Sequence, residues 1–201
     1  RDVQKQTPIP HAPSFQFVVS PSTRSRDLLR LLQLHTPQVL HISGHGAQGG
    51  ELLLDGVESP FSAKDSRTIM DKRILGDVVG EFSSTLRLVF LNVCYSVTES
   101  SALTERIDCL IAMNGTVEDP VALTFAATFY EQCALGSSVA KAFRQAQVEV
   151  SSQSGNYALS QVPQLRMRAG LDPEKYQLVK PPITPSSPRP SSEGAAVRRL
   201  I

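Results

Sequence analysis

The sequence predicts a three-layer α/β sandwich with a mostly parallel central sheet. Strand-like and helix-like segments alternate along residues 15–150. One of these segments, 86–93, is almost wholly apolar, which is typical of a central parallel strand covered on both faces. With 201 residues, 41% of them hydrophobic and 19% charged, the chain fits one globular domain that can fill a core.

The first elements are short and are separated by proline-containing turns. Three prolines within residues 1–13 indicate a linker. Residues 15–19 (Phe-Gln-Phe-Val-Val) predict a strand, and Thr23 can cap the leucine-rich helix that follows. Pro37 ends that helix, and residues 39–42 predict the second strand.

The middle of the chain predicts two helices and three strands. Residues 51–56 indicate a small strand with a turn, which could form a hairpin arm over the site. Apolar positions at mixed three- and four-residue spacing predict a helix over 69–82. The apolar strand 86–93 follows, then a helix over 97–107 and a strand over 110–113.

The last elements predict helices and one edge strand. A helix over 119–134 has Asp119 as its expected N-cap and Pro120 in its first turn. Residues 137–150 predict another helix, and residues 165–168 predict an edge strand. The domain is therefore expected over residues 14–180.

The remaining segment, 181–201, is expected to be a disordered tail. It begins with a run rich in Pro and Ser, which cannot bury enough apolar surface to order itself.

Composition excludes several classes of partner. The 20 Lys and Arg residues against 19 Asp and Glu create no global field, so the sequence indicates no direct nucleic-acid partner. No apolar run approaches the roughly 18 to 20 residues that span a bilayer, so no membrane association is expected. No signal peptide is visible, and a leader before Arg1 stays open. Three widely spaced cysteines form neither a disulfide framework nor a CxxC metal site, which fits a reducing, cytoplasmic location.

Two predicted strands end in reactive side chains. The run Leu-His-Ile-Ser-Gly-His-Gly ends at His45 and Gly46, and Leu-Val-Phe-Leu-Asn-Val-Cys ends at Cys94. Catalytic groups collect beyond the carboxyl ends of parallel strands, so an imidazole and a thiol are expected side by side. The imidazole can activate the thiol and later protonate a leaving amine. A helix beginning near Val97 would further favour the thiolate.

Backbone N–H groups of Gly46 and Cys94 are the expected donors to a developing oxyanion. The other cysteines, Cys109 and Cys133, are interpreted as small buried hydrophobes. His41 lies inside the predicted strand, where a structural role is favoured.

The motifs His-Ile-Ser-Gly-His-Gly (41–46) and Leu-Asn-Val-Cys-Tyr-Ser (91–96) resemble those of CHAT domains, which are bacterial caspase-like peptidases. Residues 111–119 and the segments that follow also resemble this family, so the match covers roughly 15–150. The resemblance implies a caspase-like three-layer fold. It also implies that His45 is the general base, that Cys94 is the nucleophile, and that Gly46 and Cys94 supply the oxyanion amides.

The substrate-binding residues stay open. The position two before the cysteine is acidic in metacaspases and Gln in caspases, but here it is Asn92. Arg24 could lie near the arginine with which caspases read an acidic side chain. Glu118 and Asp119 could instead face a basic one. The sequence therefore does not predict which residue is preferred before the cleaved bond.

The combined reading is a cysteine endopeptidase that cleaves a protein partner through a thioester intermediate and requires no metal or organic cofactor. The resemblance suggests a regulated effector in bacterial defence or signalling, activated by a sensor domain or partner protein. Two alternatives stay open: a caspase-fold interaction scaffold, and a small-molecule amide or acyl hydrolase that uses the same dyad. Intact His45, Gly46 and Cys94 argue against a decayed scaffold.

Overall fold

The computed structural model describes residues 15–21, 23, 25–44, 52–55, 67–70, 72–97 and 101–179. Its central sheet has the strand order β1-β4-β5-β6. These strands are β1 (Val39–Ser43), β4 (Leu88–Asn92), β5 (Cys109–Met113) and β6 (Pro163–Met167). The first three are parallel and β6 is antiparallel to β5, which confirms the mostly parallel α/β architecture.

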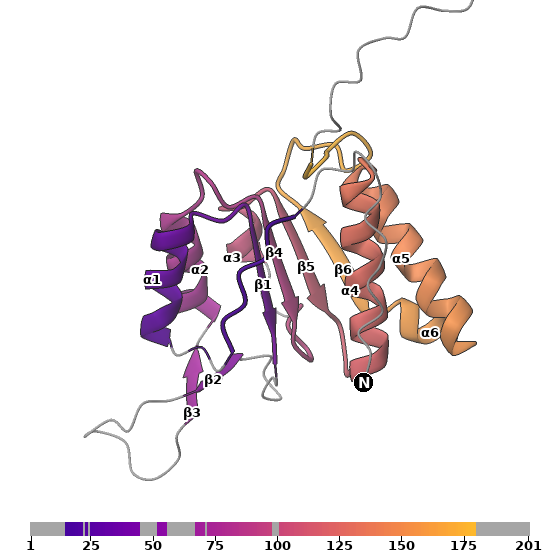
Figure 1. The fold of residues 1–201 in the computed structure, drawn as a ribbon, viewed down its shortest axis with the longest axis horizontal. Coiled ribbons are helices and arrows are strands. Elements are labelled where there is room, and N and C mark those ends of the chain that lie inside the picture. Colours follow the sequence, from indigo (N-terminus) through magenta and orange to yellow (C-terminus); the bar gives the residue numbers. More distant parts are fainter. Residues whose placement is uncertain are drawn as a thin grey trace, which may run out of the picture.

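Helices cover both faces of this sheet (Figure 1). One layer holds α1 (Ser25–His35), α2 (Lys72–Glu81) and α3 (Ser101–Thr104), and the other holds α4 (Asp119–Ala134), α5 (Val139–Ser154) and α6 (Tyr157–Ser160). All five residues of β4 are buried. Leu88 and Phe90 join the core under α4 and α5, whereas Val89 and Leu91 join the core under α1 and α2. The apolar run was therefore correctly interpreted as a strand covered on both faces.

A second, two-stranded sheet pairs β2 (Leu52–Asp55) with β3 (Arg67–Met70) in antiparallel fashion. The prediction of a helix from residue 69 is wrong at its start, because β3 occupies residues 67–70 and α2 begins at Lys72. Buried Leu52 lies opposite buried Met70. Pairing with β2, which is distant in sequence, therefore places residues 69 and 70 in a strand although their spacing fits a helix.

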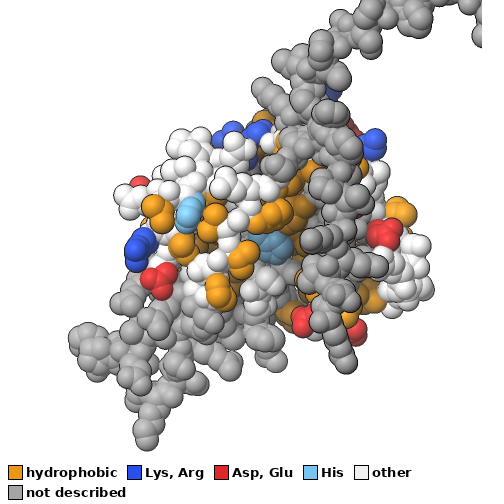
Figure 2. Space-filling view, viewed as in Figure 1, with side chains coloured by type: hydrophobic (Ala, Val, Ile, Leu, Met, Phe, Trp, Pro, Cys, Tyr) orange, Lys and Arg blue, Asp and Glu red, His pale blue; other side chains and the backbone are white. Residues whose placement is uncertain are grey.

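The predicted strand over 15–19 has no regular secondary structure. Side-chain packing holds this segment, because the rings of Phe15 and Phe17 both meet Tyr130 of α4 edge-on. Phe17, Val18 and Val19 remain exposed. On the face drawn in Figure 2, hydrophobic side chains gather in the middle of the described surface, and charged side chains lie toward its margins.

Three helix starts also differ from the prediction. Thr23 lies two residues before α1, and its hydroxyl donates to the carbonyl of Ser20. Asp119 is the first residue of α4 rather than its cap; the N-cap is Glu118, whose side chain makes no capping hydrogen bond. In α5 the cap is Ser138, whose hydroxyl accepts from the N–H of Lys141.

The predicted edge strand is confirmed as β6. The predicted linker 1–13 and the tail 181–201 lie outside the described residues. Within the described ranges, no helix is both long and apolar enough to cross a membrane.

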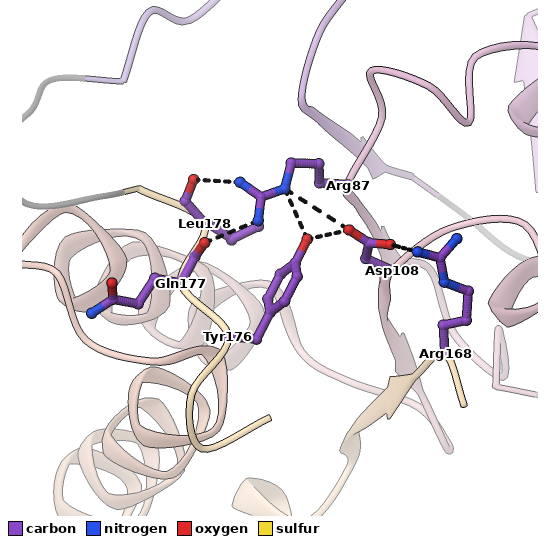
Figure 3. A network of polar contacts seen from close by, with 6 residues as sticks. All are labelled: Arg87, Asp108, Arg168, Tyr176, Gln177 and Leu178. Atoms are coloured by element: carbon purple, nitrogen blue, oxygen red, sulfur yellow. Dashed lines mark hydrogen bonds and ion pairs between the residues drawn. The ribbon is translucent and has the colours of Figure 1, made fainter. Parts of the chain in front are cut away.

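A polar network fixes the C-terminal segment to the amino ends of β4 and β5 (Figure 3). Asp108 directly precedes β5. Its carboxylate accepts a hydrogen bond from the Tyr176 hydroxyl at 2.5 Å and forms an ion pair with Arg168 at 2.6 Å. Arg87, which directly precedes β4, donates from Nε to the Tyr176 oxygen at 2.8 Å. Burial and the bond to Asp108 raise the pKa of Tyr176, so this phenol stays neutral.

The same arginine holds the main chain that follows Tyr176. Its guanidinium lies 4.7 Å from the centre of the Tyr176 ring and donates to the carbonyls of Gln177 and Leu178. Carbonyls of this segment also accept from the first N–H groups of α5, where Val139 donates to Tyr176 at 2.8 Å. We call the set Arg87, Asp108, Arg168 and Tyr176 the clamp.

Candidate active site

Neighbouring parallel strands lead to both candidate catalytic residues. β1 and β4 pair in register, and Ser43 opposite Asn92 is the last pair. Cys94 follows β4 by two residues, and in the sequence His45 follows β1 by two residues. His45 and Gly46 lie outside the described residues, as does Arg24. The structure therefore brings the two strand ends together, and the contact between the imidazole and the thiol stays a prediction.

Cys94 opens a turn that is tied to the end of β5. The hydroxyl of Ser96, which is 3% exposed, donates to the carbonyl of Leu91 at 3.1 Å and accepts from the N–H of Met113 at 2.9 Å. The N–H of Val97 donates to the carbonyl of Met113 at 3.0 Å. These bonds connect the residues after the cysteine to both strands.

A second set of bonds links the turn to the loop after β5. Tyr95 has a left-handed backbone with φ of 58°. Its N–H donates to the carbonyl of Gly115 at 3.2 Å, and its hydroxyl lies 3.1 Å from the hydroxyl of Thr116. A bulky residue in this region is strained, so the surrounding contacts must hold it there.

The expected contribution of a helix N-terminus to Cys94 is not supported. Residues 94–97 form a turn, and α3 is a single four-residue turn from Ser101 to Thr104. The predicted helix over 97–107 is thus described only as α3, and residues 98–100 lie outside the described residues. So short a helix carries little dipole.

The three thiols differ in their environment. The side chain of Cys94 is half-buried, whereas Cys109 and Cys133 have no exposed surface. Burial raises the pKa of Cys133 to about 12, and it raises that of Cys109 still further. These two thiols are therefore inert at neutral pH, as expected for buried hydrophobes.

His41 is committed to packing. Its ring stacks on Phe90 with 4.5 Å between ring centres, and its Nδ1 lies 3.1 Å from the hydroxyl of Tyr130. Desolvation in this aromatic cluster lowers the pKa of His41 to about 4, although the residue as a whole is exposed. This neutral, stacked ring agrees with the structural role that the sequence favours.

The candidate substrate-binding residues lie in two places. Asn92, the last residue of β4, is 8% exposed, and its Oδ1 is buried without a hydrogen-bond partner in the described structure. Glu118 and Asp119 are exposed at the start of α4. Thr116, which contacts Tyr95, lies two residues before Glu118, so this loop connects the nucleophile turn to α4.

Ser96 and Tyr95 were missed as functional candidates from the sequence. A serine after a strand is compatible with many roles, and its two bonds depend on β5, which lies distant in the chain. The left-handed position of Tyr95 gives no signal either, because Gly or Asn is the usual residue there. Among the described residues, no three His, Cys, Asp or Glu side chains gather in a way that could hold a metal.

Comparison with known proteins decides the family. The model of the CHAT domain matches residues 3–176. The chain belongs to the CHAT family. A curated prokaryotic protein of unknown organism, named Roc-COR-CHAT protease, is 25% identical to this CHAT chain over 132 residues. That match covers 64% of this chain and 12% of the relative, so the chain spans only a small part of the relative's length.

Proposed function

We propose that this CHAT domain is a cysteine endopeptidase in which Cys94 is the nucleophile and His45 is the general base. The observation that carries the proposal is the in-register, parallel pairing of β1 and β4. Each candidate residue follows its strand by two positions, at the carboxyl edge of the sheet where catalytic groups collect.

The proposed reaction forms a thioester and then hydrolyses it. His45 takes the thiol proton, and the sulfur of Cys94 bonds to the peptide carbonyl carbon. The N–H groups of Gly46 and Cys94 donate to the resulting oxyanion. The C–N bond breaks as the imidazolium of His45 protonates the leaving amine. Water, deprotonated by His45, then attacks the thioester, which releases the acid and restores the thiol.

The environment of the thiols supports Cys94 as the nucleophile. It is the half-buried cysteine, while the other two are sealed in the core with raised pKa values. No described residue accepts a hydrogen bond from the N–H of Cys94, so this group can serve an oxyanion. The name of the Roc-COR-CHAT relative also points to a protease.

Asn92 is the favoured contact for the substrate side chain. In the part of the chain that the structure describes, its buried Oδ1 has no hydrogen-bond partner, and a buried acceptor is costly until a donor reaches it. A substrate side chain with an N–H group would satisfy this oxygen. Glu118 and Asp119 would add a preference for a basic side chain, whereas Arg24 would favour an acidic one.

Regulation by a sensor domain or partner protein completes the proposal. The Roc-COR-CHAT relative is several times longer than the matched region, so further parts of such a protein could control the peptidase. We place this activity in a cytoplasmic effector of bacterial defence or signalling. Binding of the partner would raise the population of the competent state.

A library of mixed-sequence fluorogenic peptides tests the proposed reaction. Cys94→Ala is expected to abolish cleavage, and His45→Ala is expected to lower turnover at least ~100-fold, as for loss of a general base. His35→Ala changes an exposed histidine at the end of α1 and serves as the matched control. Equal cleavage by the parent and the Cys94→Ala chain would refute the dyad.

The regulatory part needs a separate comparison. The turnover of one good peptide is measured for this chain alone and for the longer protein with its trigger. A large increase in the longer protein is expected. Equal rates would show that the peptidase is constitutively active.

A further inference from the structure

The turn after Cys94 is held by a buried hydroxyl that bridges two strands. Ser96 donates to Leu91 of β4 and accepts from Met113 of β5, at 3.1 and 2.9 Å. Its side chain is almost fully buried, so both bonds are protected from competing water. The two bonds satisfy this buried hydroxyl and connect the turn to both strands.

The backbone beside Ser96 is strained where the candidate nucleophile lies. Tyr95 keeps a left-handed conformation, which persists only when surrounding contacts over-determine it. Those contacts include the bond from the N–H of Tyr95 to Gly115 and the bond from the N–H of Val97 to Met113. Ser96, between them, fixes the same turn from inside the core.

The N–H of Cys94 differs from the N–H groups that follow it in the turn. The next three N–H groups all have acceptors: that of Tyr95 donates to Gly115 after β5, that of Ser96 to Val93, and that of Val97 to Met113. In the described structure none of the backbone bonds uses the N–H of Cys94. An oxyanion donor must be held in place before the reaction, because a mobile donor loses most of its electrostatic advantage.

We propose that Ser96 is a positioning residue for catalysis: its two hydrogen bonds hold the turn so that the N–H of Cys94 is preorganised to bind an oxyanion. This inference rests on the proposed function of Cys94. It assigns to Ser96 an effect on the transition state, beyond its contribution to the fold.

Two small reagents separate oxyanion stabilisation from thiol reactivity. In both reactions the thiol proton of Cys94 passes to His45. With p-nitrophenyl acetate, the sulfur bonds to the acetyl carbon through an oxyanion, and p-nitrophenolate leaves with the C–O bond electrons. With iodoacetamide, the sulfur displaces iodide from a saturated carbon, and no oxyanion forms. The ratio of the two rates at Cys94, measured by mass spectrometry on the 201-residue chain, therefore reports the oxyanion donor.

Ser96→Ala is expected to lower acetylation of Cys94 about tenfold or more, while alkylation stays within about twofold. Ser96→Thr keeps the hydroxyl and is expected to recover most of the acetylation rate. Ser160→Ala is the matched control. That serine is also buried, donates to Tyr157 and accepts from Gln161, but it lies in α6. Both rates should be unchanged in this control.

Three outcomes would overturn the inference: Ser96→Ala keeps both rates, loses both in equal proportion, or is not rescued by Ser96→Thr. If Ser96→Ala does not fold, Ser96→Cys tests the same position, because a thiol is only a weak donor and acceptor in place of the hydroxyl. The ratio of acetylation to alkylation at Cys94 should fall in this variant as well, and an unchanged ratio would count against the inference.

Failure of the proposed function is visible separately. If Cys94→Ala releases p-nitrophenolate as fast as the parent chain, Cys94 is not the acylated group and both proposals fall. If release depends on Cys94 but not on Ser96, only the positioning role is refuted.

Discussion

Individual side chains in this CHAT domain differ sharply in how far water reaches them. Cys94 is half-buried in a turn, whereas Cys109 in β5 and Cys133 in α4 have no exposed surface. His41 also lies on the sheet, with its ring face covered by Phe90. Burial thus makes Cys109 and Cys133 inert at neutral pH, whereas Cys94 keeps part of its surface exposed.

Cys94 should be the first thiol to react in the folded chain. Isotope-coded maleimide at neutral pH is expected to label Cys94 well before the other two, because burial raises their pKa values and denies the reagent access. Mass spectrometry after proteolysis measures the order, and a denatured sample, in which all three thiols react, is the control. Faster labelling of Cys109 or Cys133 in the native state would contradict the assignment.

His41 should make the fold less stable in acid. Its pKa is about 4 in the fold and 6.5 in an unfolded chain, so between these values the unfolded state binds more protons. The free energy of unfolding should therefore fall as pH drops from about 6.5 toward 4. His41→Phe keeps a ring on Phe90 but cannot titrate, so its melting temperature should depend less on pH. Matching pH slopes for the two chains would exclude this role; His35→Phe is the control.

Secondary-structure elements that depend on local sequence pattern were predicted better than those that depend on distant partners. The apolar run of β4 and the helix 119–134 depend on local pattern and were predicted correctly. β3 and the turn at Cys94 depend on distant partners, Leu52 for one and Met113 for the other. Residues 69 and 70 fit a helical period equally well, and only pairing with β2 makes them a strand.

The candidate site divides in the same way. The sequence was sufficient to place Cys94 beyond a central strand, because strand type and position are local properties. It was insufficient for Ser96 and Tyr95, since their roles arise from bonds to Met113 and Gly115, which a single sequence does not reveal.

The two long helices of the second layer should respond differently to loss of their cap residues. Ser138→Ala removes a side-chain bond to Lys141 and should lower the free energy of unfolding by about 1 kcal/mol. Glu118→Ala is the matched variant at the start of α4, where no side-chain bond exists, so a smaller change is expected. Urea unfolding followed by circular dichroism compares them. An equal or larger loss in Glu118→Ala would mean that this carboxylate stabilises α4 in another way.

In the molecule as a whole, the candidate site and the clamp lie at opposite ends of the central strands. Cys94 follows the carboxyl end of β4, while the clamp lies at the amino ends of β4 and β5. The clamp connects three distant parts of the chain through Arg87, Asp108 and Tyr176. Its bonds are partly shielded from solvent, so they should matter more than surface ion pairs.

Breaking the clamp should destabilise the fold without changing the candidate site. Asp108→Ala leaves Tyr176 and Arg168 without their shared acceptor and is expected to cost about 1 to 3 kcal/mol in the free energy of unfolding. Glu174→Ala removes the exposed ion pair with Arg144 and should have little effect. Thermal melts measure both, and alkylation of Cys94 checks the site. A melt of Asp108→Ala like that of the parent would rule out an anchoring role.

The position of the clamp also determines where a fused partner would emerge. Leu178, whose carbonyl accepts from Arg87, is buried next to the end of the described chain. It lies at the end of the sheet opposite Cys94. A fluorescent reporter or affinity handle joined near Leu178 would therefore start a full strand length, roughly 17 Å, away from Cys94. Attachment there would keep such a reporter clear of the candidate site.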